Sequence, residues 1–238
     1  MNIIELNNAN LIVRNMGKLH PILTHASSTV PPGVHLLAGN SRLHVVSLMD
    51  LIVRKTELQS GDIRVNGKAS WPTGRLGIFS SVVTGINAIS HFSALYGIDR
   101  ALTISFIREH FNNSDLLWEK MVNWPAQERA HFGLLLSLLP DFDIYLIDSN
   151  IAFTDDLEFS RKFIQLFLSR LQGKSALITA KQVQVVRALC TSAVYVGDGT
   201  VNVTRDVEDA LERNNSKPIN IGSINETAEV DEDDGLLF

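Results

Sequence analysis

A buried strand, a short turn and a helix follow one another between residues 34 and 47, and this segment constrains the fold most strongly. Residues 34–38 form an apolar run, Gly39-Asn40 interrupts it, and a helical pattern follows. The same order of elements carries phosphate-binding loops, in which glycine N–H groups converge on the anion. Such a loop also needs a lysine for the terminal phosphates and a Ser or Thr hydroxyl for magnesium.

The chemical groups of such a loop are replaced in this chain. His44 and Val45 stand at the lysine and Ser/Thr positions, and Ser41 and Leu43 stand at glycine positions. A histidine is mostly neutral near pH 7, so it does not supply the point charge of a lysine. The segment therefore predicts the shape of a phosphate-binding loop without its reaction.

Composition limits the class of protein. The chain has 238 residues, 45% of them hydrophobic and 20% charged, which suits one large α/β domain or two small lobes. The net charge of −5 gives no electrostatic reason to expect nucleic acid as a partner. The single cysteine, Cys190, cannot form an internal disulfide, and no Cys/His spacing suits zinc. No apolar run suits a membrane span and no signal peptide is evident, so a cytoplasmic protein is expected.

The second half of the chain alternates strands and helices. Residues 144–148 form a continuous apolar run, typical of a central strand buried on both faces, and residues 176–179 form a second strand. Helices are expected over 155–172 and 183–189, and a hairpin is expected between 193 and 203. This alternation is the pattern of parallel βαβ units.

The first half is less regular. Residues 3–6 and 11–14 suggest two short strands, and residues 45–55 suggest an amphipathic helix. Asn66-Gly67 is a strong hairpin signal. A mainly helical region is expected between Gly85 and Trp124, and the helix after it begins at Pro125, since proline suits the first helical turn.

Three segments, in the right order along the chain, share motifs with one family. The first contains Ser70-Trp71-Pro72 and the pattern Phe79-x-x-x-x-Thr84-Gly85; the others are residues 124–148 and 176–199. Together they resemble the segment after the phosphate loop, the signature helix with its Walker B strand, and the switch strand with its closing hairpin. The family is that of the capsular polysaccharide export ATP-binding proteins, which are nucleotide-binding subunits of ABC transporters.

The resemblance covers about residues 1–205. It implies an α/β, P-loop NTPase-like ABC nucleotide-binding domain with a parallel core sheet, an N-terminal antiparallel β part and a helical subdomain. We place this domain at residues 1–213, with the helical subdomain at about 86–135. The acidic residues 214–238 are expected to form a disordered tail.

Most residues that perform chemistry in that family are replaced. Five replacements lie outside the phosphate loop, at the signature, the catalytic glutamate, the metal-sensing glutamine, the switch histidine and the adenine-stacking aromatic. Pro125-Ala126-Gln127 replaces the signature, Ser149 the catalytic glutamate, and Ser80 the metal-sensing glutamine. Lys181 replaces the switch histidine, and the region of Leu11 lacks the adenine-stacking aromatic. Phosphoryl transfer depends on positioning and charge stabilisation, so each lost group takes a multiplicative share of the rate.

What is left is a degenerate nucleotide site. Its predicted members are the equivalents of the family's nucleotide-binding positions: Gly39, Asn40, Ser41, Arg42, His44, Val45 and Asp148. No catalytic residue and no metal ligand is predicted, and binding of ATP and magnesium is expected to be weak or absent. Alternatively, His44 is a solvated residue at a helix start and Asp148 a structural residue at a strand end. Arg42, His44 and Lys181 could also hold an anion together.

The resemblance also implies partners. We expect a non-hydrolysing structural or regulatory subunit of a polysaccharide exporter, peripheral at the inner face of the plasma membrane. A polytopic transmembrane permease would dock near residues 79–97, and the chain would form a homodimer or pair with another ABC ATPase. Two alternatives remain open: a slow or partner-dependent ATPase that energises export, and a binding module unrelated to transport.

Overall fold

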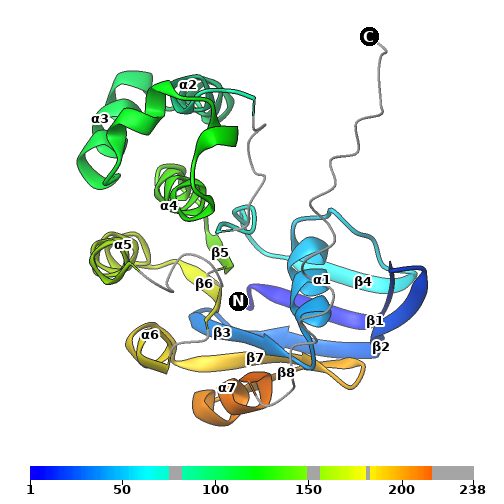
Figure 1. Ribbon diagram of the computed structural model, residues 1–238. Coiled ribbons are helices and arrows are strands. Elements are labelled where there is room, and N and C mark those ends of the chain that lie inside the picture. Colours follow the sequence, from blue (N-terminus) through cyan, green and yellow to red (C-terminus); the bar gives the residue numbers. More distant parts are fainter. Residues whose placement is uncertain (75–81, 149–155, 181–182, 216–238) are drawn as a thin grey trace, which may run out of the picture.

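The computed structural model describes residues 1–74, 82–148, 156–180 and 183–215 (Figure 1). Within these ranges the strands form a three-stranded and a five-stranded sheet. The strands are β1 (Ile4–Asn15), β2 (Lys18–Val30), β3 (Val34–Gly39), β4 (Ser60–Val65), β5 (Ile144–Asp148), β6 (Ser175–Thr179), β7 (Ser192–Gly197) and β8 (Thr200–Thr204). The α-helices are α1 (Arg42–Ile52), α2 (Gly85–Tyr96), α3 (Arg100–His110), α4 (Ala126–Ser137), α5 (Leu157–Arg170), α6 (Val183–Leu189) and α7 (Val207–Asn215), and η1 (Ser114–Trp118) and η2 (Met121–Asn123) are 3-10 helices.

The five-stranded sheet is the predicted parallel core. Its order is β5-β6-β3-β7-β8, and only the pair β7–β8 is antiparallel. Every residue of β5 and β6 is buried, as predicted. The central place predicted for residues 144–148 is wrong, because β5 is the edge strand of this sheet, where isolated bridges from Ala69 and Thr73 cover it. The α/β architecture predicted from the alternating second half is confirmed.

The three-stranded sheet is antiparallel, with order β2-β1-β4. The prediction of two short strands at 3–6 and 11–14 is wrong, because β1 is continuous and absorbs register shifts around Asn8, whose φ is +48°. The hairpin predicted at Asn66-Gly67 is also wrong. The chain continues there toward β5, and the N–H of Asp143 donates to the carbonyl of Lys68 at 2.9 Å.

Helix α1 lies between the two sheets. It begins at Arg42 and ends at Ile52, three residues earlier at each end than predicted. The C-terminal shift has a local cause, since Arg54 takes a φ of +58°, which a helix cannot continue through. Buried side chains of α1 share one apolar cluster with β1, β2 and the core strands. This packing fixes the helix start relative to the core sheet.

The predicted helical region contains α2, α3, η1 and η2, and the following helix α4 begins one residue after Pro125. Aromatic rings join this subdomain to the core. Trp71 lies edge-on to Phe92 of α2 and to Phe142 before β5, with ring centroids 5.7 Å apart in both pairs. No helix within the described ranges is long and apolar enough to cross a membrane.

Candidate functional site

The turn between β3 and α1 is short and held to the neighbouring hairpin. Only Asn40 and Ser41 separate the strand from the helix. The N–H of Asn40 donates to the carbonyl of Val196 at 3.0 Å, and its side-chain amide donates to Asp198 at 2.9 Å. The Tyr195 hydroxyl lies 2.9 Å from the amide oxygen of Asn40. The polar groups of Asn40 are therefore bonded to the β7–β8 hairpin.

The glycines around this turn serve close packing. A Cβ atom at Gly39 would lie 2.6 Å from the carbonyl oxygen of Val196, which real Cβ atoms do not approach. A Cβ atom at Gly197 would lie 2.4 Å from the amide oxygen of Asn40. In a phosphate-binding loop, glycine makes room for the anion. Here, Gly39 makes room for the adjacent strand.

The first turn of α1 contains the remaining loop positions. Ser41 is the N-cap residue, but its side chain caps no backbone N–H; its hydroxyl lies 2.8 Å from Nδ1 of His44 instead. Val45 is only 3% exposed and belongs to the apolar cluster between the sheets. The magnesium-binding hydroxyl position thus holds a buried aliphatic side chain.

Asp148 ends β5 and is the most buried charged group at the site, with its side chain 1% exposed. Its Oδ2 forms an ion pair with the guanidinium of Arg42, at the start of α1. Its Oδ1 accepts a hydrogen bond of 3.0 Å from the hydroxyl of Thr179, at the end of β6. A guanidinium stays charged at any physiological pH and offers only donors, so it matches a carboxylate well.

These residues do not fit a bound ATP–magnesium complex. The position of the lysine is taken by His44, the hydroxyl position by Val45, and both oxygens of Asp148 are bonded to side chains of this chain. No group of three or more His, Cys, Asp or Glu residues within the described ranges could hold a metal ion. Sequence reasoning named Arg42 and Asp148 separately and missed both their pairing and Thr179.

The curated proteins with similar sequences described below are all named ATP-binding proteins. The chain is 27% identical over 175 residues to the ATP-binding protein BexA of Haemophilus influenzae, covering 74% of this chain and 78% of BexA. It is 26% identical to the capsule polysaccharide export ATP-binding protein CtrD of Neisseria meningitidis, covering 67% and 73%. It is 25% identical to a polysialic acid transport ATP-binding protein KpsT of Escherichia coli, covering 87% and 96%.

The chain is therefore similar to the ATP-binding subunits of capsule polysaccharide exporters, as its motifs indicated. Solved structures agree on the fold. An ATP-binding subunit of an ABC transporter superimposes with a TM-score of 0.68 at 14% identity, covering 86% of this chain and 90% of that one. A dimeric ATP-binding cassette bound to ADP and Pi gives 0.68 at 13% identity, covering 85% and 98%. No family model matches the chain.

Leu11 lies in the region where the resemblance places the adenine-stacking aromatic. Leu11 is 0% exposed and lies in the apolar cluster between the sheets. A side chain in that place has no free face for a base. Leu11 itself is therefore part of the core and cannot stack on a base.

An acid, Glu128, directly follows the three residues that replace the signature sequence. Helix α4 follows Pro125, which provides no side-chain cap, and Glu128 lies in its first turn. Burial, and then the neighbouring Asp156 carboxylate, raise the pKa of Glu128. Within the described residues, Oε2 of Glu128 is buried and has no hydrogen-bond partner. A carboxylate there would repel an opposing phosphate in its ionised form.

Several predicted positions lie outside the described residues. They are Ser80, Ser149 and Lys181. The structure brings Gly39, Asn40, Ser41, Arg42, His44 and Val45 into one turn and joins this turn to Asp148 through Arg42. Weak or absent binding of nucleotide by these residues stays a prediction.

Proposed function

We propose that this chain is a non-hydrolysing structural or regulatory subunit of a surface polysaccharide exporter. The observation that carries the proposal is the bonding of both Asp148 oxygens to Arg42 and Thr179. A subunit that hydrolyses ATP must stabilise charge on the transferred phosphoryl group, usually through lysine and magnesium. Two relatives are named for capsule polysaccharide export and polysialic acid transport, and this supports polysaccharide export as the process.

Purified protein should show no magnesium-dependent ATP hydrolysis, alone or with candidate partners. The Asp148→Asn variant and the native chain should both release phosphate only at the background rate, because no metal-dependent step is lost. The Asp50→Asn variant, which alters the pair between Asp50 on α1 and the exposed Lys55 after it, serves as the matched control. Turnover that disappears with Asp148→Asn and persists with Asp50→Asn would establish the slow or partner-dependent ATPase instead.

The proposed partner is a polytopic membrane permease that contacts the helical subdomain near residues 79–97. Support comes from large apolar side chains that are exposed there, since such patches mark interaction surfaces. Val82 precedes α2, Leu95 lies near its C-terminal end with 77% of its surface exposed, and Leu102 lies on α3. The same proposal includes a location at the inner face of the plasma membrane and pairing with a second ABC subunit.

Substitution of Leu95 by aspartate should reduce co-purification with the permease about tenfold or more, because a central apolar contact is worth at least about 1.4 kcal/mol. The matched control is Leu19→Asp, on β2 of the antiparallel sheet, where the leucine is also exposed. Both variants should unfold at the denaturant concentration of the native chain. Equal recovery of the permease with both variants would contradict the docking surface, and no recovery with the native chain would favour a binding module unrelated to transport.

A further inference from the structure

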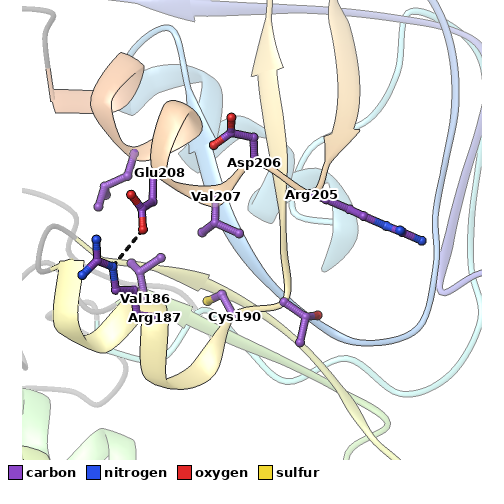
Figure 2. A pocket seen from close by; sticks show the side chains of 9 residues that line it. Val186, Arg187, Cys190, Arg205, Asp206, Val207 and Glu208 are labelled. Atoms are coloured by element: carbon purple, nitrogen blue, oxygen red, sulfur yellow. Dashed lines mark hydrogen bonds and ion pairs between the residues drawn. The ribbon is translucent and has the colours of Figure 1, made fainter.

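A cleft lies between α6 and the start of α7, and the function proposed above does not use it. Its volume is about 640 Å³, within the usual range for binding pockets (Figure 2). It opens at the edge of the core sheet where β7 begins and β8 ends, opposite the edge that carries Arg42 and Asp148. Its lining residues come from α6, the α6–β7 loop, and the start of α7: Val186, Arg187, Cys190, Thr191, Arg205, Asp206, Val207, Glu208 and Leu211.

The cleft combines apolar surface with cations. Cys190 and Val207 are half-buried, and both belong to the apolar shell around the core. Arg187 and Arg205 line the cleft, and Arg187 donates to Glu208 at 2.8 Å across it, whereas the side chain of Arg205 extends away from that pair (Figure 2). Both partners of that ion pair are more than half exposed, so water screens it and it exchanges readily.

Both acids that line the cleft accept a bond from another group of the chain, whereas one of its two arginines forms no ion pair among the described residues. Asp206 accepts the N–H of Asp209 at 2.9 Å at the start of α7, and Glu208 is paired with Arg187. Within the described residues, Arg205 forms no ion pair. The cleft thus favours an anionic ligand that also carries apolar groups.

One segment of this chain has that chemistry. Residues 229–234 contain five acids, and Leu236, Leu237 and Phe238 follow after Gly235. We propose that residues 229–238 bind in this cleft, with the apolar triplet over Cys190 and Val207 and the acidic run beside the two arginines. This inference is independent of whether the chain hydrolyses ATP.

The covalent connection makes the segment available to the cleft. Helix α7 forms one wall, ends at Asn215, and leads directly into the chain that contains the segment. The thirteen residues 216–228 can span up to about 45 Å when extended, and roughly 20 Å on average as a flexible coil. The nine residues of α7 are only about 14 Å long. A ligand on such a tether has an effective concentration in the millimolar range.

The reporter for this interaction is part of the chain, because Cys190 is its single cysteine and lines the cleft. Modification of Cys190 by a small maleimide should be about tenfold slower in the full chain than in a variant with Leu236, Leu237 and Phe238 changed to serine. A tethered segment at an effective concentration of about 1 mM, which binds with a dissociation constant of about 0.1 mM, would protect the thiol about tenfold. Burial raises the pKa of the Cys190 thiol to about 12, so all rates are compared at one alkaline pH.

Two further variants separate specific docking from a change in folding. Leu168→Ser removes an exposed leucine on α5 and should leave the modification rate unchanged. Arg205→Glu reverses the cation at the cleft and should accelerate modification, as should an increase in salt. All variants should unfold at the same denaturant concentration as the native chain.

Equal rates in the full chain and in the triple-serine variant would overturn the proposal. Protection that grows with protein concentration would also overturn it, because the occupant would then be a second copy of the chain. Protection independent of concentration, lost with the triplet and weakened by Arg205→Glu, is the expected result.

Discussion

Replacement of Arg42 by alanine is expected to lower the free energy of unfolding by about 2–3 kcal/mol. The substitution removes the guanidinium that pairs with Oδ2 of the buried Asp148 carboxylate, whose Oδ1 accepts from Thr179. The loss should fall below the 3–5 kcal/mol that is typical of a fully buried pair, because the Arg42 side chain is 47% exposed and water can approach. Urea denaturation with an unchanged m-value measures it.

The matched control is Lys55→Ala. Lys55 pairs with Asp50 on the surface at 3.9 Å, so its loss should change the stability by no more than about 0.5 kcal/mol. Arg42→Lys should fall between the two variants, since a lysine keeps the charge but not the planar donor geometry. If Arg42→Ala were as stable as Lys55→Ala, the pair would not be a structural part of the site.

The same pair bears on nucleotide binding. Magnesium could reach Asp148 only after Arg42 had moved away, so a nucleotide complex would first have to disrupt an interaction of about 2–3 kcal/mol. Removal of Arg42 would not restore the site, because His44 and Val45 still occupy the lysine and hydroxyl positions.

The predictability of the fold differs between its two halves. The strands β5 and β6 are continuous apolar runs separated by helical patterns, so composition and spacing indicate a parallel sheet directly. The strands β1 and β2 have polar residues on an exposed face and shift register at bulges. A bulge breaks the alternation on which strand prediction depends, so one long strand looks like two short ones.

The candidate site was predictable in position but not in its bonding. Local sequence places Gly39 to Val45 in a turn and the first turn of a helix, and Asp148 at a strand end. The ion pair joins residues 106 positions apart, so it depends on the order of β5, β6 and β3 in the sheet. A clue was present: an arginine lies in a loop that has lost its lysine, and the acid opposite needs a cation.

Gly39→Ala is expected to destabilise the chain by about 3 kcal/mol, at the upper end of overpacking costs. The added methyl group would lie 2.6 Å from the carbonyl oxygen of Val196 and 3.3 Å from Cβ of His44. The backbone cannot shift away, since Gly39 is paired with Val196 in the parallel ladder between β3 and β7. Thermal or urea unfolding provides the measurement.

The control for this substitution is Gly17→Ala, in the β1–β2 turn. Gly17 has a φ of +75° and nothing within 4 Å of its added Cβ, so the cost is only the conformational one of about 1–2 kcal/mol. A glycine kept for phosphate would be silent in the absence of nucleotide, because its free face would point to solvent. A large effect of Gly39→Ala in nucleotide-free protein, and a smaller one of Gly17→Ala, would therefore show that Gly39 is required by the sheet. Equal effects of the two substitutions would contradict that role and return Gly39 to the nucleotide site.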